Sequence, residues 1–373
     1  MVKKLYILLS FFAISLNAMN SWAFETDAEY AILVDYDTDT VLYEKKADEK
    51  MHPSSMTKLM TTYIAFDKLS KGELTMDTEF PISKKAWQTQ GTKMFVKVED
   101  NVKLEDLLKG VIVQSGNDAC IAIAEGISGD EAMFAELMNK YAQELGLTKT
   151  HFKNSNGLSE PEHLMSARDL AILSKALIKN FPQYFDLFGV TEYSYANITQ
   201  PNRNVLIGEM GVDGLKTGST DEGGYGIAIS ASQNGRRLIG VVNGLKSEKA
   251  RKESAQKLLQ YGFGNFEYKI LVPKGYEMAQ IPVWYGANSK YKLVADRDYG
   301  IMVDKTKSKS QEVKLKYSKP LMAPVKEGDK IAELIISDGN QDISYDLTAS
   351  EAVKKSSWFG IAIQNMMNKL LSK

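Results

Sequence analysis

The sequence has few of the residues on which metal sites and disulfide-stabilised folds depend. Cys120 is the single cysteine among 373 residues, and His52, His151 and His163 are the three histidines. One thiol cannot build a disulfide framework within the chain, so packing must stabilise the fold. A dedicated zinc site and a histidine-based serine triad both have few candidate residues. We therefore expect neither a metal nor a cofactor.

The chain also lacks an excess of charge of either sign. Its 46 lysines and arginines and 47 acidic residues leave a formal net charge of -1, so no global field attracts nucleic acid. Hydrophobic residues make up 44%, which is ordinary for a globular protein and sufficient for a sizeable core. The length allows two or three domains.

The apolar run at residues 5–16 is too short to span a bilayer comfortably. It follows Lys3 and Lys4 and precedes Ser21-Trp22-Ala23, which offers small residues at the positions that a signal peptidase reads. This layout predicts a secretory signal peptide at residues 1–23, and the alternative is an uncleaved N-terminal anchor. We expect an exported protein.

Strand patterns lie at both ends of residues 24–263, with helical patterns between and after them. Residues 29–35 and 40–44 predict two early strands, and residues 225–232 and 237–244 flank Asn234-Gly235, a strong hairpin signal. Apolar spacing predicts helices at 55–69, 104–113, 118–125, 131–145, 167–178 and 251–261. The simplest closure is an α/β (α+β) unit in which early and late strands pair in an antiparallel sheet covered by helices.

Two further segments differ from this unit. Residues 264–350 alternate short apolar runs with Gly, Pro, Asn and Asp, which predicts a small all-β domain. Residues 351–373 place Phe359, Ile363 and Met366 on one helical face, with lysines near both ends. This pattern predicts an amphipathic helix that anchors the protein at a membrane surface. The alternative is a helix packed on the β-domain or in an oligomer.

Ser55 and Lys58 form the first candidate catalytic pair. A helix places residues i and i+3 on one face, so the amine of Lys58 can lie beside the Ser55 hydroxyl. A lysine can take the proton of a serine if burial or a neighbouring positive charge lowers its pKa. The Ser-x-x-Lys spacing recurs elsewhere in this chain, so the pattern alone is a weak signal.

A second polar segment, Ser115-Gly116-Asn117, lies between two helical patterns. Ser and Asn around a Gly are typical of a turn. A hydroxyl and a carboxamide at a loop tip can also relay a proton and hold a substrate amide.

A third segment, Lys216-Thr217-Gly218-Ser219, lies on a predicted strand. Glycine in a strand often lets another backbone approach closely, and a strand edge can pair with an extended peptide. Lys216 supplies positive charge and Thr217 and Ser219 supply hydroxyls, which together suit a carboxylate. The alternative is the basic end of a hairpin.

The three segments in this order resemble the signature of β-lactamases and penicillin-binding proteins. More specifically, the chain resembles the low-molecular-mass penicillin-binding proteins of the serine-type D-alanyl-D-alanine carboxypeptidase family. The matching segments are residues 52–61, 114–120, 156–158, 166–169 and 212–218. The resemblance covers nearly the whole chain after residue 23. It implies a serine β-lactamase/penicillin-binding-protein-like catalytic domain at residues 24–263, a β-rich domain at 264–350 and a membrane-anchor helix at 351–373.

The resemblance also implies the catalytic roles. Ser55 would attack the carbonyl between the last two D-alanines of a peptidoglycan stem peptide, and Lys58 would take its proton. Ser115 and Lys216 would help to pass a proton to the departing D-alanine. β-Lactam antibiotics would act as inhibitors by acylating Ser55.

Substrate binding is implied for five residues. Asn117 would hold the substrate amide, and Lys216, Thr217, Gly218 and Ser219 would form the strand that binds the substrate and its terminal carboxylate. The backbone N–H groups of Ser55 and Ser219 would form the oxyanion hole.

Family members often add an arginine after the second hairpin strand as a carboxylate clamp. Lys246 stands there in this chain, and Arg251 is a weaker candidate. A lysine is a point charge and cannot make the bidentate contact of an arginine. We therefore place neither residue in the catalytic set.

Two other functions remain open at this point. A serine β-lactamase of class A would add a glutamate that activates the deacylating water, and Glu160-Pro161-Glu162 is superficially similar to that loop. The Leu-Asn expected after it is replaced by His163-Leu164-Met165. A non-catalytic cell-wall scaffold would require a degraded motif. The carboxypeptidase interpretation is preferred, at the periplasmic face of the inner membrane.

Overall fold

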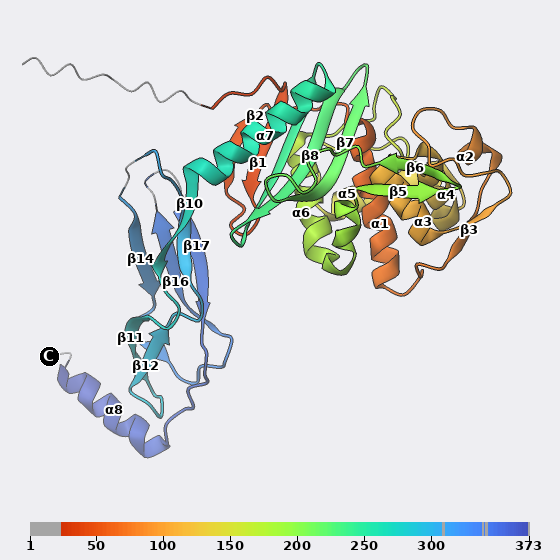
Figure 1. Ribbon diagram of the computed structural model, residues 1–373. Helices are drawn as coiled ribbons and strands as arrows, with labels where there is room; N and C mark the ends of the chain where they lie inside the picture. Colours follow the sequence, from red (N-terminus) through yellow and green to blue (C-terminus); the bar gives the residue numbers. More distant parts are fainter. Residues whose placement is uncertain (1–23, 308–309, 338, 340–341, 372–373) are drawn as a thin grey trace, which may run out of the picture.

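The structure is a computed structural model that describes residues 24–307, 310–337, 339 and 342–371. Figure 1 shows a sheet-and-helix unit joined to an elongated β-rich part, with the C-terminal helix at the far end of the β-rich part. The predicted signal peptide at residues 1–23 lies outside the described residues. Among the described residues, no helix combines the length and the apolar character needed to cross a membrane.

A five-stranded antiparallel sheet organises the first unit. Its order is β2-β1-β9-β8-β7, so early strands pair with late ones as the sequence predicts. Asn234 and Gly235 both adopt positive φ in the β8–β9 turn, which is why this pair favours a hairpin. The strands are β1 (Tyr30–Asp35), β2 (Val41–Lys45), β7 (Val212–Thr220), β8 (Gly224–Gln233) and β9 (Arg236–Leu245).

Helices cover both faces of this sheet. Successive strand residues point to opposite faces, so Ile32 of β1 packs with the main helical core, whereas Ala31 and Leu33 pack beneath α7 (Figure 1). The helices are α1 (Lys58–Ser70), α2 (Lys84–Gln88), α3 (Leu104–Lys109), α4 (Asn117–Ser128), α5 (Glu131–Glu144), α6 (Ala167–Asn180) and α7 (Glu248–Asn265).

The structure corrects some predicted boundaries. Ser55 lies in a 3-10 turn, Ser54–Thr57, and the α-helix begins at Lys58. The helix predicted at 104–113 changes to a π-helical turn at Gly110–Gln114. Two short hairpins were not predicted, because three- or four-residue strands carry almost no periodic signal. They are β3 (Glu79–Pro81) with β4 (Asn101–Lys103), and β5 (Glu192–Tyr195) with β6 (Ile198–Pro201).

The β-rich part has a hydrophobic core of its own, which includes Ile281, Ile301 and Ile336. Its strands are β10 (Phe266–Val272), β11 (Glu277–Trp284), β12 (Lys290–Val294), β13 (Tyr299–Asp304), β14 (Glu312–Tyr317), β15 (Leu321–Met322), β16 (Lys330–Ser337) and β17 (Asp342–Thr348). The all-β prediction is therefore confirmed, although β15 and β17 were not foreseen. The last described element is α8 (Trp358–Leu371).

Candidate active site

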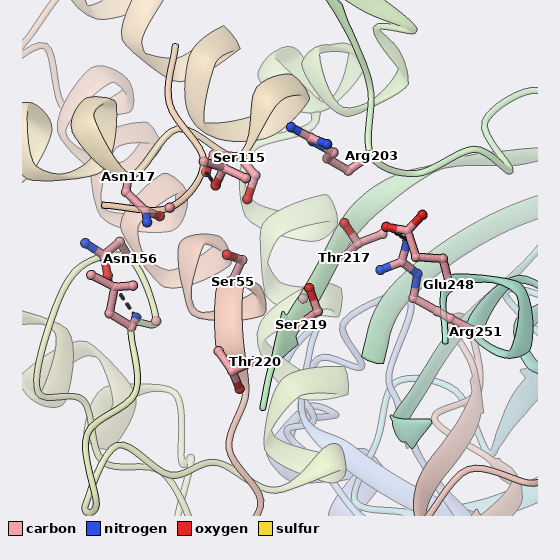
Figure 2. A pocket seen from close by; sticks show the side chains of 15 residues that line it. Ser55, Ser115, Asn117, Asn156, Arg203, Thr217, Ser219, Thr220, Glu248 and Arg251 are labelled. Carbon is pink, nitrogen blue, oxygen red and sulfur yellow. Dashed lines mark hydrogen bonds and ion pairs between the residues drawn. The ribbon is translucent and has the colours of Figure 1, made fainter. Parts of the chain in front are cut away.

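Six of the eight predicted site residues line one cavity, which we call the Ser55 cavity. Figure 2 shows Ser55 between the Asn117 side of this cavity and the β7 side, which carries Thr217 and Ser219. The 3-10 turn before α1, the loop before α4 and strand β7 therefore meet at one place, although they are far apart in the sequence. The six lining residues are Ser55, Ser115, Asn117, Thr217, Gly218 and Ser219.

Strand β7 approaches the turn that carries Ser55 through Gly218. A Cβ at Gly218 would lie 2.9 Å from the Pro53 carbonyl oxygen and 3.2 Å from the Met56 nitrogen. A side chain there would push the two segments apart, so the predicted close backbone approach is confirmed. Ser54 and Thr220 tie the same segments together by a hydrogen bond of 2.8 Å between their hydroxyls.

Lys58 is fully buried behind Ser55. Its Nζ lies 2.8 Å from Ser55 Oγ, 2.8 Å from Asn117 Oδ1 and 2.7 Å from the Asn156 carbonyl oxygen. Burial penalises the charged form and lowers the pKa of Lys58 to about 8. A neutral amine keeps two N–H groups, enough for Asn117 and Asn156, and its lone pair then faces the Ser55 hydroxyl.

Lys216 is the second buried lysine at this site. Its Nζ donates to the Thr217 carbonyl oxygen at 3.2 Å. Burial, followed by the nearby charge of Lys58, lowers the pKa of Lys216 well below its ordinary value. Cys120 is buried close to both lysines, and burial raises the pKa of its thiol to about 12. The thiol therefore stays protonated, whereas the Ser55 hydroxyl contacts the amine of Lys58.

The Ser115 segment is held in an uncommon conformation. Ser115 has a φ of 62°, the left-handed region, directly after the π-helical turn. Thr92 Oγ1 donates to the Ser115 carbonyl at 2.6 Å, and the Asn117 backbone N–H donates to the Thr92 carbonyl at 2.7 Å. Asn117 Nδ2 donates to the Gln90 carbonyl at 2.7 Å. One hydrogen of this amide group remains for a substrate carbonyl.

Comparison with known proteins identifies relatives along most of the chain. Residues 17–247 match the family model described as D-alanyl-D-alanine carboxypeptidase, and residues 266–355 match the penicillin-binding protein 5 C-terminal domain. The chain is 37% identical to D-alanyl-D-alanine carboxypeptidase DacC of Escherichia coli, over 90% of this chain and 86% of that protein.

This chain belongs to the D-alanyl-D-alanine carboxypeptidase family.

Solved structures of this family agree with the fold. The crystal structure of penicillin binding protein 5 from Haemophilus influenzae matches with a TM-score of 0.81 at 35% identity, covering 89% of this chain and 99% of that one. Penicillin-binding protein D2 from Listeria monocytogenes, solved in an ampicillin-bound form, matches with a TM-score of 0.59 at 27% identity, covering 64% and 98%. The expected low-molecular-mass penicillin-binding-protein fold is confirmed.

The structure gives this carboxypeptidase-family site two arginines that sequence reasoning missed or ranked low. Arg203 and Arg251 line the Ser55 cavity on the β7 side (Figure 2). Arg251 is buried in the first turn of α7, where it pairs with Glu248 at 3.8 Å. Lys246, which was considered first, is exposed and does not line the cavity. Sequence spacing alone could not reveal how α7 is oriented, so it could not rank Lys246 against Arg251.

Asn156 is a further residue whose role the sequence left open. It lies on the opposite side of Ser55 from the arginines and supplies a backbone carbonyl to Lys58 (Figure 2). Its own Oδ1 accepts from the Leu158 N–H at 2.9 Å, which holds the loop in shape. A backbone ligand carries no side-chain signature, so only the folded chain identifies it.

The structure does not favour the β-lactamase alternative. Glu160 and Glu162 are exposed, neither lines the Ser55 cavity, and Glu162 pairs with Lys153 at 2.9 Å. Among the described residues, Glu248 is the carboxylate that lines this cavity, and it pairs with Arg251. The described site therefore lacks the glutamate beside Ser55 that class A chemistry requires.

His163 joins the Asn156 loop to the turn that carries Ser55. Its Nδ1 accepts from the Lys153 N–H at 3.1 Å, so the neutral ring carries its hydrogen on Nε2, which lies 2.8 Å from Thr57 Oγ1. His163 is 2% exposed, and burial lowers its pKa from 6.5 to about 4. Protonation would break the Lys153 bond and place a charge near Lys58.

This burial predicts that acid destabilises the protein through His163. Between the unfolded pKa of 6.5 and the folded value of about 4, the unfolded chain binds a proton that the folded chain does not. From pH 7.5 to pH 5, the wild-type free energy of unfolding should therefore fall by about 2 kcal/mol more than that of His163→Gln. Denaturant unfolding at both pH values measures this difference. Equal falls in the two proteins would contradict a buried neutral His163.

Proposed function

We propose that this serine-type D-alanyl-D-alanine carboxypeptidase removes the terminal D-alanine of peptidoglycan pentapeptides through an acyl-enzyme on Ser55. The observation that carries the proposal is the contact between the Ser55 hydroxyl and a buried amine that has no carboxylate partner among the described residues. Family membership supplies the reaction, and this contact supplies a way to activate the serine.

Acylation begins when the Lys58 amine takes the Ser55 proton and Ser55 Oγ attacks the scissile carbonyl carbon. Negative charge then develops on the carbonyl oxygen, where the backbone N–H groups of Ser55 and Ser219 act as donors. Loss of one such donor typically costs about 3 kcal/mol of barrier. The C–N bond breaks as the leaving nitrogen receives a proton through Ser115 and Lys216. D-Alanine departs, and an ester remains on Ser55.

In deacylation, water is the nucleophile and Ser55 is the leaving group. Water enters the position that D-alanine leaves, and the Lys58 amine takes its proton as the water attacks the ester carbonyl. Ser55 recovers its proton and the shortened peptide is released. No cofactor takes part in either half of the reaction.

The charges in the Ser55 cavity orient the substrate. Arg203 and Arg251 line the same side of the cavity as the hydroxyls of Thr217 and Ser219, so the terminal carboxylate of the substrate binds at this side (Figure 2). The acyl part of the peptide then leads across Ser55 toward Asn117. This direction assigns the amide-holding role to Asn117 and the carboxylate to the β7 side.

β-Lactams act as inhibitors in the same way. They acylate the serine, and their ring-opened leaving group stays attached and cannot make room for water. Penicillin-binding protein D2 from Listeria monocytogenes, which shares this fold, was solved in an ampicillin-bound form, and this supports β-lactam binding here.

Penicillin provides the direct test of Ser55. We expect intact mass to show one covalently bound penicillin on the chain from residue 24 onward, mapped to Ser55, and no adduct on Ser55→Ala. Ser70→Ala is the matched control, because Ser70 is an exposed serine at the end of α1 that does not line the Ser55 cavity. It should keep the adduct. D-alanine release at the wild-type rate by Ser55→Ala would rule out the mechanism, and rapid destruction of penicillin would indicate a β-lactamase.

The pKa of Lys58 predicts a basic limb in the pH profile. Because the neutral amine is the active form, kcat/KM for D-alanine release should rise about tenfold per pH unit below pH 8 and level off above it. Lys58→Arg should remove activity at every pH, because arginine stays protonated. A flat wild-type profile between about pH 6 and pH 9 would contradict Lys58 as the base.

We also propose that the protein is exported through residues 1–23 and held at the periplasmic face of the inner membrane by α8. The polar side of α8 contacts the β-rich part: Tyr285 N–H donates to Gln364 Oε1 at 2.6 Å, and Tyr285 OH donates to Asn365 Oδ1 at 3.0 Å. Trp358 and Phe359 remain 80% and 61% exposed. An exposed apolar face favours an interfacial membrane anchor over a helix packed on its own domain.

Vesicle flotation tests this anchor. Replacing Phe359 and Met366 (61% and 60% exposed) with serine should weaken binding to anionic vesicles more than about tenfold, since each buried apolar side chain contributes roughly 1.5–3 kcal/mol. Val205 and Tyr276 are 60% and 57% exposed on other elements, so the matching double serine variant is the control. It should bind like wild type. Equal binding by all three proteins would contradict the anchor.

A further inference from the structure

A second cavity, which we call the side cavity, adjoins the Ser55 cavity, and the two share Asn156 and Leu158 in their walls. Helix α2 contributes Lys84, Lys85 and Gln88 to the side cavity, and the loop after Leu158 contributes Glu160. The mechanism above uses none of these four side chains. Asn156, which both cavities share, lies on the opposite side of Ser55 from Arg203 and Arg251 (Figure 2).

The walls of the side cavity are held in place by an ion pair and several hydrogen bonds. Glu131 is buried at the start of α5 and pairs with Lys85 at 2.8 Å. It also accepts hydrogen bonds from the Ser155 hydroxyl at 2.7 Å and the Ser155 N–H at 3.2 Å. Asn154 Oδ1 accepts from Gly157 N–H at 2.8 Å, which closes the loop on itself. The walls are therefore in place before a ligand binds.

Two charges of the side cavity have no partner in the described part of the chain. Lys84 is exposed, and its amine makes no ion pair or side-chain hydrogen bond among the described residues. The same is true of the Glu160 carboxylate. The cavity thus offers one unpaired ammonium and one unpaired carboxylate, whereas Lys85 and Glu131 neutralise each other.

The direction of the substrate connects the two cavities, so this inference rests on the proposed function. With the terminal carboxylate at Arg203 and Arg251, the acyl part of the peptide runs from Ser55 past Asn156. Two extended residues span about 7 Å. The residue that precedes the two D-alanines therefore reaches the wall shared with the side cavity, and a long side chain can enter it.

We propose that the side cavity is a subsite for the side-chain end of the residue preceding the two D-alanines, and that it selects an end bearing both an ammonium and a carboxylate. Lys84 binds the carboxylate and Glu160 binds the ammonium. A diaminodicarboxylic acid satisfies both groups. A lysine at this position of the substrate supplies the ammonium alone and leaves Lys84 unpaired. Leu158 lies against the methylene groups of either substrate side chain.

Three stem pentapeptides that differ only at the third residue test this subsite, using the chain with α8 purified in detergent. The third residue is a diaminodicarboxylic acid, the same residue with its side-chain carboxylate amidated, or lysine. Exposed ion pairs are worth little, so kcat/KM for the first should exceed that for the other two by about three- to tenfold. Lys84→Ala should remove this preference and Lys84→Arg should retain it. Glu160→Gln should lower kcat/KM for all three peptides alike.

The controls separate the subsite from the catalytic site. Acetyl-D-alanyl-D-alanine has no third residue, so Lys84→Ala should cleave it at the wild-type rate and be acylated by penicillin at the wild-type rate. Lys179→Ala removes another exposed lysine, at the end of α6, and should keep the preference.

Equal kcat/KM for the three pentapeptides in wild type would overturn the subsite while leaving the carboxypeptidase intact. An equal loss on acetyl-D-alanyl-D-alanine in Lys84→Ala would also overturn it, because Lys84 would then act on the catalytic site. No D-alanine release from any peptide would overturn the proposed function, and this inference with it.

Discussion

The burial of one lysine amine among neutral oxygens is the constraint on which the rest of this site depends. Lys58 lies within hydrogen-bond distance of Ser55, Asn117 and Asn156, and no described carboxylate pairs with it. An acidic partner would hold the amine protonated and remove its use as a base. Burial without such a partner lowers its pKa to about 8, so a useful fraction is neutral near physiological pH. Leaving a cation desolvated is unfavourable, and the surrounding fold must be stable enough to impose it.

The fold keeps the Lys58 amine buried by joining separate segments around the turn that carries Ser55. Gly218 lets β7 approach that turn, and the bond between Ser54 and Thr220 fastens the two. His163 fastens the Asn156 loop to Thr57 from the other side. Helices pack on both faces of the sheet, so strand β7, which carries residues 216–219, cannot shift without disturbing two hydrophobic cores. The positions of the site residues are therefore set by hydrophobic packing that extends well beyond the site.

The distribution of charge around Ser55 gives the site a direction. Arginines gather at the β7 side, and amide groups lie opposite them. A peptide that ends in a carboxylate has one favourable orientation in such a field. The side cavity shares Asn156, which lies away from the arginines, and its Lys84 and Glu160 have no charged partner among the described residues. The exposed Trp358 and Phe359 of α8 support the proposal that the protein is held at a membrane surface.

The sequence by itself determined much of this protein. The spacing of Ser55 and Lys58, the Ser115 and Lys216 segments, and the Asn234-Gly235 hairpin each depend on local geometry, and local geometry is written in short patterns. The early and late strands, the main helices and the β-rich part were predicted for the same reason. Only the tertiary structure decided that Asn156 contacts Lys58 through its backbone, that Arg251 rather than Lys246 lines the cavity, and that His163 bonds Thr57. These contacts join residues distant in sequence, or depend on the orientation of α7, and no local pattern records either.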